Sequence, residues 1–326
     1  MTLEDLIRSN DPQLEALALQ SPAFGIDAAN VRDRIQSRLA LFDRSYNAIV
    51  DCCAELNLSP PIETIWNLWL PLAMQIADWR RLLDRGLIQG FLGGQGTGKT
   101  TLTRVLTVIL DQLGYWAISW SIDDLYLSYV DRIALRNRDP RLIRRGPPGT
   151  HNVQLGIEVL TQFRQGNFPI ALPRFDKSLH NGEGDRTIPE TIDQADIVLF
   201  EGWFIGARPI VSEFEIAPIV TEDDRQFAGD MNEQLRNYLP LWKLLDRLIV
   251  MYVPNYQLSK QWRKQAEHRM IAQGKSGMSD AEIDQFVEYF WKALHPELFI
   301  PPILESADLV LEIGAEHTVT DVRRSY

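Results

Sequence analysis

Two patterns of hydrophobic spacing divide the chain. In residues 30–56 and 62–83, apolar side chains recur at intervals near 3.6 positions, which predicts two long helices, and nothing before residue 84 alternates like a strand. From residue 87 onward, short apolar runs replace this spacing. The runs predicted to be strands are Leu87–Leu92, Trp116–Ser119, Ile170–Leu172, Ile197–Phe200, Leu248–Val253 and Leu309–Ile313.

Segments with helical spacing separate most of the predicted strands. The clearest are Thr100–Leu113, Val153–Phe163, Gln257–Ala272 and Asp280–Leu294. Alternating strands and helices predict a three-layer α/β sandwich, with a mostly parallel sheet and helices on both faces. We therefore expect an N-terminal helical region over residues 1–84 and an α/β domain over residues 85–326. Residues 180–190, rich in glycine and charge, predict a long surface loop.

The strongest motif follows the first predicted strand. Residues 93–100 read GGQGTGKT and match the P-loop pattern, GxxxxGK followed by Ser or Thr, and a helical segment comes next. Glycines let backbone amides approach a phosphate, Lys99 brings charge to the β- and γ-phosphates, and Thr100 offers a hydroxyl to Mg²⁺. The alternative is a glycine-rich turn that only caps a helix, but a chance match in this length is roughly one in a hundred. The predicted nucleotide-binding residues are Gly93, Gly94, Gln95, Gly96, Thr97, Gly98, Lys99, Thr100 and Thr101.

Carboxylates follow two further predicted strands, where ligands bind in open α/β sheets. Asp123 and Asp124 come after the second strand, and a carboxylate there can accept the proton of a hydroxyl that attacks the γ-phosphate. The alternative is that both only cap the next segment. Which of the two acts as the base stays open at this point. Glu201 ends the fourth strand, and it can hold Mg²⁺ together with Thr100.

Basic residues form three groups that can face an anionic substrate. Arginine side chains match carboxylate and phosphate oxygens, although a solvated surface explains many of them equally well. Arg263 lies on a predicted helix after the fifth strand and is placed to close over the phosphates. The remaining candidates for substrate contact are Asp124, Tyr126, Arg145 within the arginine-rich residues 132–145, Arg174, Asp176 and Lys177.

Composition narrows the class of partner. The formal net charge of −11 disfavours a nucleic-acid backbone, because phosphate contacts need clustered Lys and Arg. No apolar run approaches the ~20 residues that cross a bilayer, and no secretory signal is recognisable. The only cysteines are the neighbours Cys52 and Cys53, which fits a reducing compartment. We expect a cytoplasmic protein with no membrane and no nucleic-acid partner. His151 is expected to be structural, since no further His or Cys stands at ligand spacing.

Several segments together resemble one kinase family. GGQGTGKTT, SIDDLYL, RGPPGTHN, LPRFDKS, LFEGWFIG, WRKQAEHRM and GMSDAEIDQFV recur in the order found in plant and cyanobacterial D-glycerate 3-kinase. That family is a branch of the phosphoribulokinase, uridine kinase and pantothenate kinase group of P-loop kinases. The resemblance covers roughly residues 85–315. It departs from the family pattern at Leu125, Phe175 and Asn152, where Phe, Tyr and Asp are usual.

The resemblance implies a fold and an activity. It implies a P-loop NTPase-type sandwich that uses ATP and Mg²⁺ to convert D-glycerate to 3-phospho-D-glycerate in photorespiration. By position, Asp123 resembles the catalytic base, Glu201 the magnesium-associated acid, and Asp176 a holder of acceptor hydroxyls. We expect direct in-line transfer, with Lys99, Asp123 and Arg263 as catalytic residues. A related kinase of nucleosides or pantothenate, and a nucleotide-driven switch ATPase, remain as alternatives.

Overall fold

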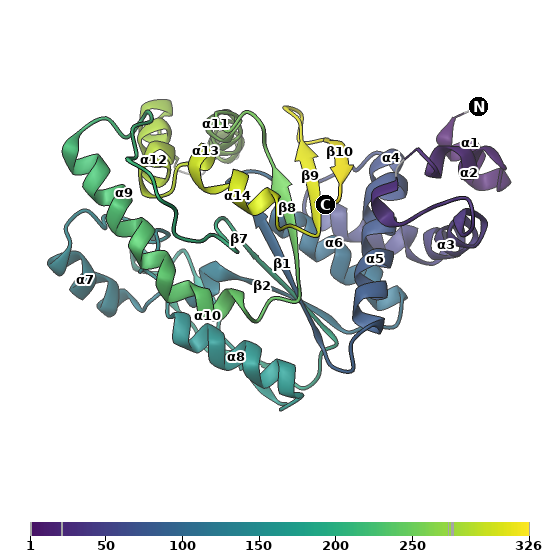
Figure 1. The fold of residues 1–326 in the computed structure, drawn as a ribbon, viewed down its shortest axis with the longest axis horizontal. Helices are drawn as coiled ribbons and strands as arrows, with labels where there is room; N and C mark the ends of the chain where they lie inside the picture. The colour runs from purple at the N-terminus through teal and green to yellow at the C-terminus, as the bar shows by residue number, and fades with distance from the viewer. Residues whose placement is uncertain (1, 21, 273, 275–276, 326) are drawn as a thin grey trace.

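The computed structural model describes residues 2–20, 22–272, 274 and 277–325, and its centre is one six-stranded sheet (Figure 1). The strand order is β10-β9-β8-β1-β7-β2, and all neighbouring pairs are parallel except β9 with β10. The strands are β1 (Leu87–Gly93), β2 (Ala117–Ser121), β7 (Ile197–Gly202), β8 (Arg247–Tyr252), β9 (Leu309–Ile313) and β10 (Val319–Arg323). The predicted fold class, a mostly parallel three-layer sandwich behind N-terminal helices, is confirmed.

Helices cover both faces of the sheet because its strands are apolar on both sides. In β1, Leu87 and Phe91 belong to one buried cluster, whereas Ile88 and Leu92 belong to the other. Successive strand residues point to opposite faces, so a continuous apolar run needs a helical layer on each side. On the first face lie α3 (Val31–Glu55), α5 (Leu70–Arg81) and α6 (Lys99–Gln112). On the second lie α8 (Val153–Gln165), α10 (Leu239–Trp242) and α14 (Pro301–Leu304).

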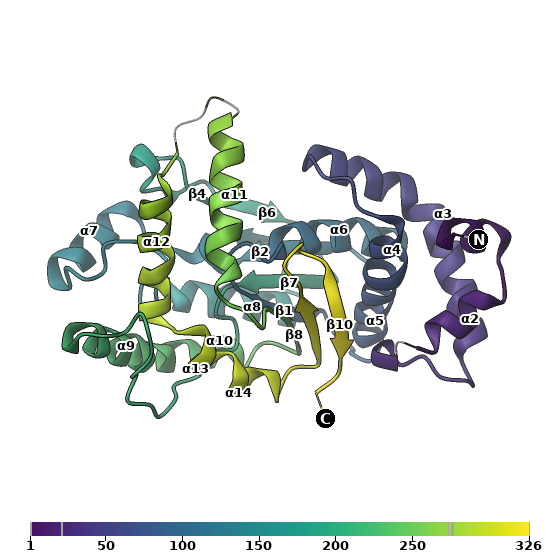
Figure 2. The ribbon, with the colours of Figure 1, turned by 90° about the horizontal axis from the view of Figure 1, so that it is seen from above.

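The N-terminal helices pack directly on the α/β core. They comprise α1 (Leu3–Ser9), α2 (Gln13–Ala18), α3, α4 (Ile62–Thr64), a π-helical turn over Ile65–Trp69, and α5. Buried residues of α3 and α5 share one cluster with α6, the helix that follows the P-loop (Figure 2). The boundary at residue 84 between two units stays a prediction. Within the described ranges, no helix is long and apolar enough to cross a membrane.

The remaining helices surround the carboxyl ends of the strands. They are α7 (Tyr129–Arg138), α9 (Glu222–Gln234), α11 (Leu258–Ala272), α12 (Asp280–Ala293) and α13 (Pro296–Phe299). The two helices α11 and α12 run side by side over this end of the sheet (Figure 2). This end therefore carries both the P-loop and the elements that can cover it.

Ile170–Leu172 is a strand, as predicted, but it lies outside the main sheet, and the expectation of a long loop over residues 180–190 is wrong in part. Ile170–Leu172 forms β3, which pairs antiparallel with β6 (Glu190–Ile192) outside the main sheet. Its burial alternates, with Ala171 exposed, whereas every residue of β7 is buried as an inner parallel strand requires. Within the expected loop, β5 (Asp185–Arg186) pairs with β4 (Phe175–Asp176), so this segment is folded back as a hairpin.

Candidate active site

The P-loop joins β1 to α6 through a turn that only glycine accommodates easily. Gly96 and Gly98 have φ angles of +80° and +85°, in the left-handed region that favours glycine. A Cβ on Gly93 would lie 2.7 Å from Thr97 Oγ1, so this position also requires a bare backbone. The Thr97 hydroxyl donates to Gly94 O at 2.9 Å and closes the turn. The sequence motif and the observed loop therefore agree.

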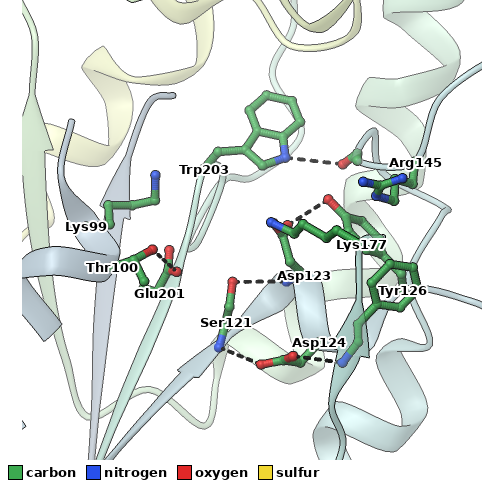
Figure 3. Close-up of polar contacts among 12 residues, drawn as sticks. Lys99, Thr100, Ser121, Asp123, Asp124, Tyr126, Arg145, Lys177, Glu201 and Trp203 are labelled. Carbon is green, nitrogen blue, oxygen red and sulfur yellow. Dashed lines mark hydrogen bonds and ion pairs between the residues drawn. The ribbon is translucent and has the colours of Figure 1, made fainter. Parts of the chain in front are cut away.

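Lys99 lies across the mouth of this loop. Its Nζ donates to Gly94 O at 2.9 Å, which keeps the ammonium beside the backbone amides of the turn. Burial lowers the pKa of Lys99, while the nearby carboxylates of Glu201 and Asp123 act in the opposite direction. Asp123 lies in the turn after β2, at the same end of the sheet as Lys99 (Figure 3).

Thr100 and Glu201 bring two oxygens together beside the loop. The Thr100 hydroxyl donates to Glu201 Oε1 at 3.0 Å (Figure 3). Glu201 is buried on β7, directly opposite Phe91 of β1 in the parallel ladder, so the sheet itself fixes its position. A hydroxyl next to one carboxylate suits Mg²⁺, which takes few protein oxygens and keeps several waters.

Asp123 carries two strong hydrogen bonds from opposite sides. It lies in a short 3₁₀ turn, Ile122–Leu125, directly after β2. Lys177 Nζ donates to Oδ2 at 2.6 Å, and the Tyr126 hydroxyl donates to Oδ1 at 2.6 Å (Figure 3). Burial raises the pKa of Asp123, but the Lys177 charge and the two hydrogen bonds outweigh it and hold the pKa below its usual range. Asp123 is therefore an ionised carboxylate at neutral pH.

Asp124 is tied to the backbone and to Arg174. Its Oδ1 accepts from Phe175 N at 3.1 Å, and its Oδ2 accepts from Arg174 Nη1 at 3.1 Å and from Ser121 N at 3.4 Å. The contact with Ser121 is part of a capping box at the start of the 3₁₀ turn. The sequence allowed two roles for Asp123 and Asp124, a catalytic base or a cap, and the structure gives the two residues different surroundings. Asp124 caps and anchors, whereas Asp123 faces Lys177 and the P-loop side.

Aromatic side chains hold Tyr126, which donates a hydrogen bond to Asp123, in place. The Tyr126 ring stacks on His151 with centroids 4.7 Å apart, and His151 Nδ1 lies 2.8 Å from the Tyr238 hydroxyl. Burial lowers the pKa of His151 to about 3, so its ring is neutral at physiological pH. Asn152, where the resembled family has Asp, accepts from Leu155 N at 3.0 Å and caps α8. His151 fits the structural role expected for it, and no spacing in the sequence points to its contact with Tyr238.

Within the arginine-rich residues 132–145, Arg145 lies over Tyr126, the aromatic residue that donates a hydrogen bond to Asp123. Its guanidinium is 5.9 Å from the Tyr126 ring centroid and 5.7 Å from that of Phe175, and it donates to Gly182 O at 2.7 Å. Arg132 is buried and donates to three backbone carbonyls, so it holds the chain in place. Arg141 pairs with Asp139 and Asp230. These two arginines serve the fold.

Two of the predicted substrate residues are engaged elsewhere. Arg174 pairs with Glu190 at 2.6 Å as well as with Asp124. Asp176 Oδ1 accepts from Ser178 N at 2.8 Å and from Ser178 Oγ at 2.6 Å, which forms a local turn. Both residues precede Lys177 closely in sequence, yet neither makes a hydrogen bond to Asp123 in the described part of the chain. Their proposed contacts with a substrate stay predictions.

Arg263 lies on α11, the helix that touches the P-loop. A Cβ on Gly96 would come within 3.0 Å of Trp262 Cβ, so the helix packs directly on the turn. Arg263 itself lies 3.2 Å from Glu267 and stands over the Phe286 ring of α12 at 5.4 Å. Its guanidinium is therefore held between the two helices, and its catalytic role stays a prediction.

Trp203 is a site residue that the sequence reasoning did not select. It follows β7 two positions after Glu201, and its Nε1 donates to Gly146 O at 3.2 Å (Figure 3). This bond links the P-loop side to the segment that carries His151 and Arg145. The EGW sequence after the strand was the available signal, because the tryptophan immediately follows the acidic strand end.

The fold and this site define a P-loop kinase, and comparisons with known proteins agree. D-glycerate 3-kinase of Arabidopsis thaliana is 32% identical over 245 residues, covering 71% of this chain and 52% of that protein. A Saccharomyces cerevisiae protein named "Probable ATP-dependent kinase TDA10" is 34% identical, covering 61% of this chain and 73% of its own. The structure of D-glycerate 3-kinase from Cryptococcus neoformans superimposes with a TM-score of 0.64 at 26% identity, over 78% of this chain and 99% of that one.

The chain therefore belongs to the family of P-loop kinases that includes plant D-glycerate 3-kinase and its fungal relatives. The chain spans about half the length of the Arabidopsis protein, so the activity of that whole protein is transferred here only as a proposal. No family model matches the chain.

Proposed function

We propose that this kinase phosphorylates D-glycerate on O3 with ATP, forming 3-phospho-D-glycerate and ADP. The observation that carries the proposal is the Asp123 carboxylate, which Lys177 and Tyr126 hold ionised at the same end of the sheet as Lys99 of the P-loop (Figure 3). A base and a cation side by side suit an acceptor that has both a hydroxyl and a carboxylate. The plant relative and the Cryptococcus structure, both named D-glycerate 3-kinases, support the choice of acceptor.

The transfer step follows from the positions of these groups. The acceptor hydroxyl gives its proton to Asp123 while its oxygen forms the bond to the γ-phosphorus. The bond from phosphorus to the β–γ bridging oxygen breaks, and ADP leaves with that electron pair. Lys99 and the P-loop amides stabilise the charge on the transferring oxygens, so most of the catalysis is positioning and electrostatics.

Magnesium fits the pair formed by Thr100 and Glu201. In the described residues no group of three or more His, Cys, Asp or Glu gathers to form a metal cage. A hydroxyl and one carboxylate are the kind of partial ligand set that Mg²⁺ accepts when nucleotide phosphates are present. Mg²⁺ bound there would neutralise phosphate charge, and Glu201 would orient it from β7.

The aromatic residues of the site favour a small anion over a nucleoside. A nucleobase needs an open ring to stack on, and Tyr126 and Phe175 are the candidates from the sequence. Tyr126 already packs on His151, and Phe175 has Arg132 at 5.1 Å and Arg145 at 5.7 Å from its ring centroid. These contacts leave cations rather than an aromatic slot beside Asp123.

An acceptor panel tests the proposal. Purified enzyme with ATP and Mg²⁺ is assayed for ADP release with D-glycerate, L-glycerate, glycerol, uridine and pantothenate. We expect release that depends on D-glycerate and is weak with glycerol, because glycerol offers no carboxylate to Lys177 and Arg145. Robust turnover of uridine or pantothenate, with none of D-glycerate, would leave the kinase class intact and overturn the acceptor. The cytoplasmic location stays a prediction. The Arabidopsis relative is named as a chloroplastic enzyme.

A further inference from the structure

Both oxygens of the Asp123 carboxylate already accept a hydrogen bond from protein. Lys177 occupies Oδ2 and Tyr126 occupies Oδ1, each at 2.6 Å. A general base must itself accept a hydrogen bond from the hydroxyl it deprotonates. Each carboxylate oxygen has two lone pairs, so the hydroxyl must share an oxygen with one of these donors, and Asp123 is the weaker base for as long as that donor stays in place.

Lys177 is the donor that can move. The Tyr126 side chain is buried, stacked on His151 and packed at 5.1 Å against Phe175, so its hydroxyl is fixed. The Lys177 side chain is 58% exposed, and its only salt bridge within the described residues is to Asp123. A lysine ammonium sits on a flexible four-carbon stem, so it can swing without disturbing the backbone.

The chemistry of the acceptor decides whether Lys177 moves. Moving the exposed ammonium away leaves the less exposed Asp123 carboxylate without its counter-ion, and a second anion that attracts the ammonium offsets this cost. A hydroxy acid supplies such an anion on the same molecule as the reacting hydroxyl. Glycerol and water supply a hydroxyl but no anion, so they leave the ion pair in place.

We propose that Lys177 is a specificity-determining latch, which holds Asp123 until the carboxylate of an anionic acceptor draws the ammonium away. This inference rests on the proposed function, since it explains how that site recognises a hydroxy acid. The latch makes the base available only when the acceptor carries the correct charge. It also disfavours hydrolysis, in which a water oxygen would bond to the γ-phosphorus, its proton would pass to Asp123, and ADP would leave.

The experiment compares full-length wild type with Lys177→Met, Lys177→Arg and a matched control. The control is Lys292→Met, which removes a lysine paired with Asp224 at 2.8 Å on helices α12 and α9, away from Asp123. Initial rates of ADP release with Mg·ATP are measured without acceptor, with D-glycerate and with glycerol. Circular dichroism and nucleotide affinity verify that each variant is folded.

We expect Lys177→Met to hydrolyse ATP without acceptor about tenfold faster than wild type, the factor that loss of one charged hydrogen bond typically gives. Its preference for D-glycerate over glycerol in kcat/KM should fall by about tenfold or more. Lys177→Arg should restore most of the suppression, because it keeps the charge. Lys292→Met should match wild type in both measurements.

The pH profile separates the latch from a merely structural lysine. The groups that face Asp123 are Lys177, Tyr126, His151 and Lys99, and only Lys177 is removed. The acid limb of acceptor-independent hydrolysis should therefore move to higher pH in Lys177→Met. A Lys177→Met enzyme that hydrolyses ATP no faster than wild type at any pH, and still prefers D-glycerate to the same degree, overturns the latch. Wild type that ignores D-glycerate overturns only the proposed acceptor, because the hydrolysis comparison is made without one.

Discussion

The two sides of the site are built in different ways. The phosphate side, with Lys99 and Thr100, comes from consecutive residues at the start of α6, and we expect their backbone amides and the helix end to do most of the phosphate binding. The acceptor side joins Asp123 and Tyr126 of one turn with Arg145 and Lys177 from two other segments, through side-chain contacts. A site built from backbone amides keeps its shape through most substitutions. A site built from side chains can change its specificity through a single substitution. We therefore expect the first side to define the kinase class and the second to define the acceptor.

Asp123→Asn should have the largest effect on turnover. The amide keeps the size of the side chain but cannot take the hydroxyl proton, so kcat should fall by about 10²–10⁴-fold. Nucleotide affinity should stay near that of wild type, because Asp123 belongs to the acceptor side. The comparison variant is Asp124→Asn, whose side chain is occupied by Ser121, Phe175 and Arg174. An inactive Asp124→Asn enzyme beside an active Asp123→Asn enzyme would reverse the assignment.

Lys99→Ala should have the next largest effect, and on the phosphate side. Removing the charge that faces the transferring phosphate should lower kcat by about 10²–10³-fold with every acceptor. The fold should survive, since Lys99 contributes one hydrogen bond to Gly94 O within the loop. Steady-state rates and a thermal melt check both points. Near-normal turnover in a folded variant would remove the P-loop lysine from the mechanism.

His151 should make stability depend on pH although it takes no part in the chemistry. Its folded pKa of about 3 lies below the ordinary value of 6.5, so below pH 6.5 the unfolded chain binds a proton that the folded chain does not. Stability should therefore decline as the pH falls toward 3, by up to about 2 kcal/mol between pH 6.5 and 5 from this residue. Urea unfolding at pH 7 and pH 5 measures this. His151→Phe should lose this part of the pH dependence, and an unchanged dependence would show that the ring is protonated in the folded protein.

Arg174→Ala should have the smallest effect. Arg174 pairs with Asp124 and Glu190. Because Asp124 anchors the turn that also carries Asp123, Arg174 acts on the acceptor only indirectly. We expect the KM for D-glycerate to rise several-fold, which is about 1 kcal/mol, with the KM for ATP nearly unchanged. Initial-rate measurements at varied D-glycerate and varied ATP distinguish the two. An equal rise in both KM values would indicate a general loss of structure.

The contrast between the two sides also explains what the sequence could predict. The P-loop, the acid after β2 and the acid at the end of β7 are local signals, and all lie at the same end of the sheet. The choice between Asp123 and Asp124 was not predictable, because it depends on Phe175 and Lys177, more than fifty positions away in sequence. The position of Arg263 against Phe286 likewise depends on how α11 packs on α12.

The helices and strands that differ from the sequence-based expectation do so for similar physical reasons. Ile170–Leu172 has the composition of a strand, but three residues with one exposed side chain cannot serve inside a parallel sheet. Strand β10 was missed because Val319–Arg323 is mostly polar and pairs only at the sheet edge. The π-helical turn at Ile65–Trp69 interrupts a segment whose apolar spacing reads as one continuous helix. Local sequence patterns predicted the layers of the fold, whereas the place of β3 depends on its pairing with β6, a separate segment of the chain.

The identity of the phosphorylated product tests the central claim most directly. Wild type and Asp123→Asn are incubated with Mg·ATP and D-glycerate, and the products are resolved by phosphorus NMR. We predict that wild type forms ADP and a single phosphate ester on O3 of D-glycerate in equal amounts, and that Asp123→Asn forms neither at a comparable rate. ADP accompanied by inorganic phosphate alone, or an ester formed equally well by Asp123→Asn, would contradict the account.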